Sequence, residues 1–326
     1  HKKDYNKYLV SNEIETTSKY FDLWNSKIRP DSMQLTSFGV VGGEYNRYFQ
    51  QTGDIKFLKK AEKSLKKAVD IANIGKPGFY RSLARNYISQ HRFKEALQLA
   101  DSAAAIGGDF NENQSLFFDI HMELGNYQKA EQHLDSLKNM SDFGYMIRLA
   151  KWNDYKGDLD TTINFMEKAR TKAETSKSKD LMLWSYTNLA DYYGHAGRIQ
   201  DSYNHYLKAL EIDNDYAYAK KGLYVGETKQ YDNALILAQQ EVENRPTPES
   251  YSWLAYSLLK NGDKEKALEV MNTYVYGKTF EPTLLYQAAE VYKANGKSER
   301  VKELKGELIG AIYELGPGME KQVHDL

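Results

Sequence analysis

Apolar and small residues follow a helical spacing in the stretch LWSYTNLADYYGHAGRIQDSYNHYLKALEID, which runs from Leu183 to Asp213. In its first half, residues three, four and seven positions apart fall on one helical face: Tyr186, Leu189, Ala190 and Tyr193. Gly197 interrupts this pattern. A second stripe then follows: Ser202, Tyr206, Ala209 and Leu210. The stretch therefore predicts two short amphipathic helices joined by a turn, and neither can bury a core without neighbours.

The same pattern returns along most of the chain, in seven segments that stay in phase from about Val40 to Leu308. A small or apolar residue follows each turn and gives the period: Ala96, Ala130, Thr162, Ser202, and later Ala234, Ala267 and Val301. The intervals between successive members are 34, 32 and 40 residues in the first group and 33 and 34 in the second. A period near 34 residues with a helix–turn–helix pattern indicates a repeat array.

These segments resemble the tetratricopeptide repeat family. Its pattern W-x2-L-G-x2-Y, then A-x3-F, is matched here by Tyr186-x2-Leu189-Ala190-x2-Tyr193, then Ser202-x3-Tyr206. The resemblance implies an all-α fold, a right-handed α-solenoid of stacked antiparallel helix pairs. It also implies that the first helix of each pair lines a concave groove, which in this family typically holds a peptide or a partner helix.

Three departures from the period carry predictions of their own. Three extra residues after Gly53 predict a longer turn in the first repeat, and TKAETSKSKD predicts a longer helix or loop in the 40-residue interval. Around Gly222 and Gly226, two helix-weakening residues fall within one predicted helix. We interpret this segment as either a hinge or a place where residues of the natural protein are missing.

The pattern divides the chain into three parts. Residues 1–36 are expected to form an N-terminal capping region, with Tyr20, Leu23 and Trp24 on one helical face. Residues 37–309 form the array of about seven to eight repeats, and residues 310–326 the end of the last helix and a tail. Polar-backed ends of this kind keep solenoids soluble.

Composition narrows the possible functions. The 44 basic and 45 acidic residues nearly cancel, so net charge favours neither nucleic acid nor an anionic membrane as a partner. There is no cysteine, which removes thiol catalysis and cysteine-based zinc sites. No apolar run approaches the roughly 18 residues of a membrane-spanning helix. The opening HKKDYNKYLV has neither an initiator Met nor a signal-peptide core, which is typical of a trimmed or processed chain.

The residues with chemical potential do not form a recognised catalytic or metal-binding motif. The seven histidines occur in no HExxH pattern and are interpreted as ordinary helix or tail residues. The sequence GDLD at Gly157–Asp160 lacks the later ligands of a calcium loop and is interpreted as a turn with a helix cap. Many of the 26 tyrosines occupy repeat-defining positions, so Tyr186, Tyr193, Tyr206 and Tyr251 are predicted to lie in the core. We therefore expect no catalytic residue, no metal and no cofactor.

The candidate binding residues are the polar side chains that the resemblance places in the groove. They are basic or polar in the N-terminal half: Arg47, Arg81, Arg85, Asn86, Arg148, Lys151 and Tyr155. Later repeats present Asp191, Tyr256 and Glu290 at equivalent positions. Since arginine suits carboxylates, one hypothesis is that the basic half binds an acidic peptide or a C-terminal carboxylate. The other is that these arginines pair with Asp119 and Asp154 of neighbouring repeats.

The sequence thus favours a non-enzymatic scaffold that binds a peptide or partner protein in the groove of a solenoid. The alternative is an envelope glycan- or solute-binding protein on the same chassis, although the large loop-rich insertion that such proteins usually carry is missing. The resemblance favours an exported bacterial protein, periplasmic or at the cell surface, and the sequence equally permits the cytoplasm. Neither the identity of the partner nor the oligomeric state can be inferred from it.

Overall fold

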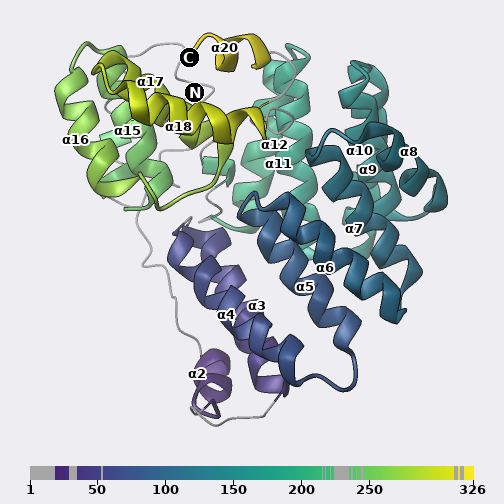
Figure 1. Cartoon of the computed structure of the whole chain (residues 1–326). Helices are drawn as coiled ribbons and strands as arrows, with labels where there is room; N and C mark the ends of the chain where they lie inside the picture. Colours follow the sequence, from purple (N-terminus) through teal and green to yellow (C-terminus); the bar gives the residue numbers. More distant parts are fainter. Residues whose placement is uncertain are drawn as a thin grey trace. The chain divides into compact units, whose positions relative to one another are not determined.

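The structure is a computed structural model that describes residues 19–28, 35–52, 54–214, 246–311 and 319–326, with 216, 218–220, 222–223, 235, 238–239, 241–243 and 315 between them. All regular structure in these ranges is helical (Figure 1). The chain divides into two compact units, which are described separately. Unit 1 is His1–Asn12, Leu134–Pro246 and Lys260–Gly262, and unit 2 is Glu13–His133, Thr247–Leu259 and Asp263–Leu326.

The helices follow one another in the alternation that the sequence predicts. Unit 2 contains the first helices of the array and the last ones: α2 (Lys19–Asn25), α3 (Leu35–Thr52), α4 (Ile55–Ile71), α5 (Lys76–Ser89), α6 (Phe93–Ile106), α7 (Phe110–Glu123), α8 (Tyr127–Ser136), α15 (Pro248–Lys260), α16 (Lys264–Tyr274), α17 (Pro282–Ala294), α18 (Ser298–Ile309) and α20 (Glu320–His324). Unit 1 contains α9 (Phe143–Tyr155), α10 (Leu159–Ser176), α11 (Lys179–His195) and α12 (Ile199–Ile212). Helix α8 ends at Ser136, past the boundary at His133, and α15 ends at Lys260, one residue past the boundary at Leu259.

Helices pack on their partner within the pairs α3–α4, α5–α6, α9–α10, α11–α12 and α17–α18, and contacts such as α4 with α5 join one pair to the next. Thus α5 packs on α6, α6 on α7, and the two first helices α5 and α7 also touch. In unit 1, α9 packs on α10, α10 on α11 and α11 on α12. The predicted all-α solenoid of stacked helix–turn–helix repeats is confirmed.

A shared turn explains the regular glycines. At the ends of α5, α7, α9, α11, α15 and α17 a residue with positive φ reverses the chain, and the next amide donates to the carbonyl five residues earlier, as in Arg198 N to Tyr193 O at 2.8 Å. Glycine occupies this position at Gly125, Gly157, Gly197 and Gly296, with φ between 68° and 80°. His91, at φ 55°, takes it between α5 and α6. These turns start each second helix at the same place relative to the first.

A close helix contact explains the glycines of α3. A Cβ on Gly42 would lie 2.9 Å from Cγ of Leu65 in α4, and one on Gly39 would lie 2.9 Å from the ring of Phe79 in α5. Because those distances are shorter than real Cβ contacts, glycine allows α3 to approach both neighbours. The extra residues after Gly53 correct a prediction: α3 ends at Thr52 and α4 begins at Ile55, so they lengthen the start of α4 rather than the turn.

Two other departures have different outcomes. TKAETSKSKD extends helices, since α10 runs to Ser176 and α11 begins at Lys179. Most of the segment around Gly222 and Gly226 lies outside the described residues. Gly222 itself is described, and a Cβ there would lie 2.2 Å from the ring of Tyr206.

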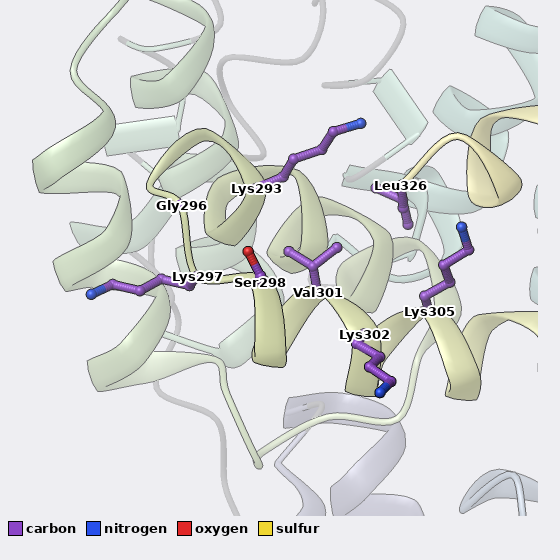
Figure 2. A pocket seen from close by; sticks show the side chains of 8 residues that line it. All are labelled: Lys293, Gly296, Lys297, Ser298, Val301, Lys302, Lys305 and Leu326. Atoms are coloured by element: carbon purple, nitrogen blue, oxygen red, sulfur yellow. The ribbon is translucent and has the colours of Figure 1, made fainter.

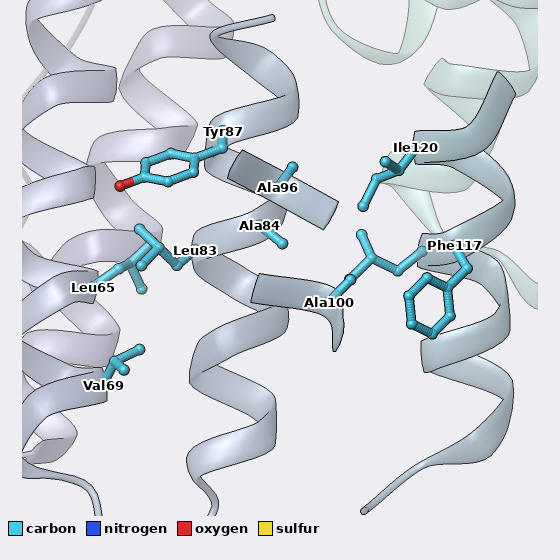
Figure 3. Packing of buried hydrophobic residues seen from close by; sticks show 10 residues of the cluster. Leu65, Val69, Leu83, Ala84, Tyr87, Ala96, Ala100, Phe117 and Ile120 are labelled. Carbon is cyan, nitrogen blue, oxygen red and sulfur yellow. The ribbon is translucent and has the colours of Figure 1, made fainter. Parts of the chain in front are cut away.

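The core between successive pairs consists of large residues set against small ones (Figure 3). Leu65 and Val69 of α4 point toward α5, where Leu83 and Tyr87 meet them. The side chains of Ala84 on α5 and of Ala96 and Ala100 on α6 are small, so these two helices lie close together. Three residues of α7 complete the cluster: Leu116, Phe117 and Ile120. Of the tyrosines predicted to lie in the core, Tyr186, Tyr193 and Tyr206 are buried, whereas Tyr251 is only half-buried.

A buried carboxylate joins α4 to the next pair. Glu62, with 9% of its side chain exposed, accepts hydrogen bonds from Lys66 at 2.6 Å, Gln90 at 3.0 Å and Arg92 at 3.1 Å. Burial alone would raise the pKa of Glu62, but these donors and the charge of Lys59 lower it to about 2. The guanidinium of Arg92 also lies over the ring of Tyr87, 4.0 Å from its centroid.

Unit 1 repeats the arrangement with other residues. The Tyr193 hydroxyl donates to Glu167 of α10 at 2.5 Å, and Arg198 lies over the Tyr193 ring at 4.3 Å. Burial, together with this carboxylate, raises the pKa of Tyr193 to about 12. In both units an acid on a second helix thus binds the tyrosine at the end of the next first helix, with an arginine stacked on that ring.

Two stacked histidines hold α7 against α8. The rings of His121 and His133 are parallel, with their centroids 5.4 Å apart, and Phe117 stacks on His133 at 4.9 Å. Gln114 Oε1 lies 2.6 Å from His133 Nδ1. Burial, His133 and Lys129 lower the pKa of His121 to about 4, and burial and Lys129 also lower the pKa of His133. The pair is therefore neutral at pH 7.

The first prediction concerns Glu62. Glu62→Gln keeps the volume of the side chain but removes the buried carboxylate that Lys66, Gln90 and Arg92 share, and it leaves Arg92 with Glu95 as its remaining carboxylate. We expect the free energy of unfolding to fall by roughly 3 kcal/mol, measured by urea denaturation at pH 7. Glu95→Gln removes the other, half-exposed partner of Arg92 and should cost less than about 1 kcal/mol. Equal losses in the two variants would contradict a special role for the buried carboxylate.

The second prediction concerns acid. Because the folded chain holds His121 at a pKa of about 4, against 6.5 when free, the unfolded chain binds more protons between these values. Stability from the pair is therefore complete above pH 6.5 and declines as the pH falls toward 4, by roughly 2–3 kcal/mol. Urea midpoints measured from pH 7 to pH 4 should show this decline. His121→Phe, which keeps a ring in the stack, should flatten it, and an unchanged slope in that variant would refute the explanation.

Candidate functional site

The predicted groove residues all lie on first helices, and they fall into two groups. Arg47 is on α3 and Arg81, Arg85 and Asn86 are on α5, all in unit 2. The other three residues are on α9, in unit 1: Arg148, Lys151 and Tyr155. Each group is therefore treated by itself, and no single surface containing all seven is described.

Arg81 and Arg85 form a charged strip with the first helix of the next repeat. Arg81 donates to Asn113 Oδ1 at 3.1 Å, and Arg85 forms an ion pair with Glu112. Both partners are on α7, whose first turn is fixed because Asp109 accepts the amide hydrogen of Glu112 at 3.1 Å. The side chains of Arg85 and Glu112 are 48% and 50% exposed, so the pair faces solvent. We call Arg81, Arg85, Glu112 and Asn113 the α5–α7 strip.

The strip bears on the two hypotheses about the arginines. Arg85 does pair with an acid of the neighbouring repeat, but that acid is Glu112 rather than Asp119 or Asp154. Arg47 pairs within its own helix with Glu44 at 2.9 Å and lies over the Tyr48 ring. The charges in this half of the array therefore have intramolecular partners, and binding of an acidic peptide by them stays a prediction.

Asn86 has a structural setting that sequence reasoning missed. Its side chain is buried and donates to Asn46 Oδ1 at 3.0 Å and to the Leu58 carbonyl at 3.1 Å. Gln90 donates to its oxygen at 2.7 Å. The amide thus ties α3, α4 and α5 together and does not reach the surface of the chain. The spacing of apolar residues could not reveal that Asn86 is buried, because its burial depends on pairing with another amide.

The α9 group borders on acidic and aromatic residues of α11. Arg148 donates to the Gly144 carbonyl at 3.1 Å, and Tyr155, 38% exposed, packs on Trp152. Burial raises the pKa of Asp154, opposed by His195 and Lys151. Burial also raises the pKa of Tyr192, with Asp154 and Asp191 adding to the shift.

Asp191 is hydrogen-bonded to two tyrosines of unit 1. Its carboxylate accepts a hydrogen bond from the Tyr218 hydroxyl at 2.7 Å and another from Tyr206. The sequence identified Asp191 only as an acidic groove position and Tyr206 only as a core tyrosine, and it did not single out Tyr218. Asp191 therefore anchors two aromatic side chains in the structure.

A cavity of about 240 Å³ lies beside the α17–α18 turn (Figure 2). None of its lining residues belongs to the predicted set: Lys293, Gly296, Lys297, Ser298, Val301, Lys302, Lys305 and Leu326. The signal that could have found it is the spacing of Ser298, Val301, Lys302 and Lys305, which places polar and basic residues on one face of a second helix.

Two further observations limit the chemistry of the described residues. Across the ranges that the structure describes, no cluster of three or more His, Asp or Glu side chains could hold a metal ion. In the same ranges, no helix is long and apolar enough to cross a membrane.

Family models match two parts of the chain. Residues 185–216 match the tetratricopeptide repeat, and residues 227–305 match anaphase-promoting complex, cyclosome, subunit 3. No curated protein matches the chain. The alternative of a glycan- or solute-binding protein gains no support from these matches.

Solved structures show the same fold at low sequence identity. One is a signal transduction ATPase with numerous domains that carries a tetratricopeptide repeat sensor, from Pyrococcus horikoshii, with TM-score 0.52, 17% identity and 96% of this chain covered. Another is the Cut9–Hcn1 hetero-tetramer of the anaphase-promoting complex, with TM-score 0.53, 15% identity and 74% of this chain covered. The chain covers 55% and 46% of those chains, so it spans about half their length. The stacked helix pairs, the glycine turns and the repeat match at residues 185–216 together identify the fold as a tetratricopeptide repeat solenoid.

Proposed function

We propose that this chain is a protein-interaction scaffold that binds a partner through the exposed faces of its first helices. The observation that carries the proposal is the α5–α7 strip. Its charged side chains are half exposed, and they belong to two successive repeats that buried contacts hold together. A partner that meets this strip finds charged side chains of both signs close together on two neighbouring first helices.

The strip carries both signs of charge, and this refines the kind of partner. Arg85 and Glu112 satisfy each other in the free chain, and exposed pairs of this kind are worth less than about 1 kcal/mol. A partner carboxylate can therefore replace Glu112 on the Arg85 guanidinium at small cost, and its own base can engage Glu112 in exchange. We accordingly propose a partner segment with an acidic residue that faces α5.

The third prediction tests this binding face. A photo-crosslinking amino acid in place of Ser89, an exposed residue in the last turn of α5, should capture the partner in the source cell. Adding Arg81→Glu and Arg85→Glu reverses the charge facing that partner, so we expect at least a tenfold loss of the crosslinked product. The readout is the crosslinked band, identified by mass spectrometry.

The matched control reverses two charges on second helices. Lys63→Glu and Lys94→Glu, on exposed positions of α4 and α6, cause the same change in net charge and should leave the crosslink within twofold. Thermal melting must show that both double variants stay folded. The proposal fails if the two double variants lose the partner equally, or if neither loses it.

A further inference from the structure

We infer that the lysine-lined cavity beside the α17–α18 turn is a second docking site, and that it takes an acidic protein segment with one apolar side chain. The inference rests on the proposal that the chain is a scaffold and adds the chemistry of one partner. Four of the eight lining residues are lysines, and no acidic side chain is among them. We call Lys293, Lys297, Lys302 and Lys305 the lysine rim.

The basic and the acidic side chains of α18 lie at different positions around the helix, and this gives the lysine rim its charge. Ser298, Val301, Lys302 and Lys305 lie on the face toward the cavity. The acids Glu299, Glu303 and Glu307 lie at positions outside that lining. Glu303 is already engaged: it accepts from Arg300 at 3.0 Å and from the Tyr276 hydroxyl at 2.9 Å. The positive charge of the cavity face is therefore not neutralised by the acids of its own helix.

Two of the lysines already bind chain oxygens. Lys293 donates to the Asp325 carbonyl at 2.7 Å, and Lys305 donates to the His324 carbonyl at 2.5 Å. These carbonyls follow the short helix α20, which is anchored on α18 by the fully buried Val323. The segment after α18 thus partly covers the cavity. It provides the His324 and Asp325 carbonyl oxygens as acceptors and Val323 as an apolar side chain.

The other two lysines remain available. In the part of the chain that the structure describes, the ammonium groups of Lys297 and Lys302 make no hydrogen bond or ion pair, and both residues are exposed. Their ammonium groups point away from each other at the edge of the cavity (Figure 2). Groups that diverge in this way cannot converge on one small anion, whereas an extended segment with several carboxylates can meet them separately.

The floor of the cavity indicates that the ligand carries an apolar side chain. Val301 and the aliphatic stems of the lysines give it apolar walls, and about 240 Å³ is room for one aliphatic side chain. An acidic segment with a single leucine or valine therefore fits both the rim and the floor.

The fourth prediction tests this site with defined peptides and the purified full chain. The probe is a fluorescein-labelled peptide of twelve residues, with glutamates on both sides of one central leucine, and the readout is fluorescence anisotropy at low salt. Lys297→Gln with Lys302→Gln should weaken binding about tenfold, because two charge contacts are lost. Lys264→Gln with Lys266→Gln on α16 removes the same charge from exposed lysines outside the cavity and should change the affinity less than twofold.

Two companion probes make the test specific. Replacing the central leucine by serine should weaken binding several-fold if the cavity takes an apolar side chain. Inorganic phosphate should compete only as bulk salt does, since it cannot bridge the diverging lysines. The inference is overturned if the wild-type chain does not bind the acidic peptide, if both lysine pairs matter equally, or if millimolar phosphate displaces the peptide. None of these outcomes bears on the α5–α7 strip, because that test uses other residues and a cellular partner.

Discussion

The rest of the structure depends on one contact, in which the second helix of a repeat packs on the first helix of the next repeat. A single helix pair buries too little apolar area to fold alone, so each pair depends on its neighbour. Glu62 and Glu167 show how specific this contact is. Each acid is met by a tyrosine of the next first helix and by an arginine stacked on that tyrosine. A slip by one residue would leave the carboxylate without donors, which is costly where the site is dry, as at Glu62.

Most of the fold could be predicted from the sequence because helix pairs of nearly equal length impose a period on it. The glycines after each first helix, the small residues after each turn and the aromatic repeat positions are local requirements, and they can be seen without a structure. The prediction failed after Gly53 because extra residues can be absorbed in two ways. Asp54 caps α4 by accepting from the Lys56 amide at 3.0 Å, and Phe57 and Leu58 find buried positions. Helix extension therefore buries side chains that a longer turn would leave in water.

The candidate binding residues could be predicted only as far as their helix and face. Arg81 and Arg85 lie on a first helix as expected, but their partners come from a repeat 27 to 32 residues further along, and spacing does not determine which acid or amide is close. The side chain of Asn86 is buried and is hydrogen-bonded to residues of two other helices, so it serves packing. The lysine rim was overlooked for the opposite reason: lysines on a second helix look like an ordinary solvated face until the tail and the turn enclose them.

The repeat positions also explain why so many tyrosines occur without forming a ligand platform. Tyr186 donates to Glu174 at 2.7 Å, Tyr193 to Glu167 and Tyr292 to Asn272 at 2.6 Å, and burial raises the pKa of each of the three to about 12. A phenylalanine would fill the same volume but would leave those acceptors without their donor. The tyrosines therefore serve stacking, and our proposals assign recognition to charged side chains that the stacking does not use. On unit 2 these are the half-exposed charges of the α5–α7 strip and the two unpaired lysines of the rim, which differ in one physical respect. The strip has two arginines and one glutamate, so an acidic partner must displace Glu112 from Arg85 to bind there. The lining that contains the rim has four lysines and no acidic side chain, so under our proposal it would attract an acidic partner before contact.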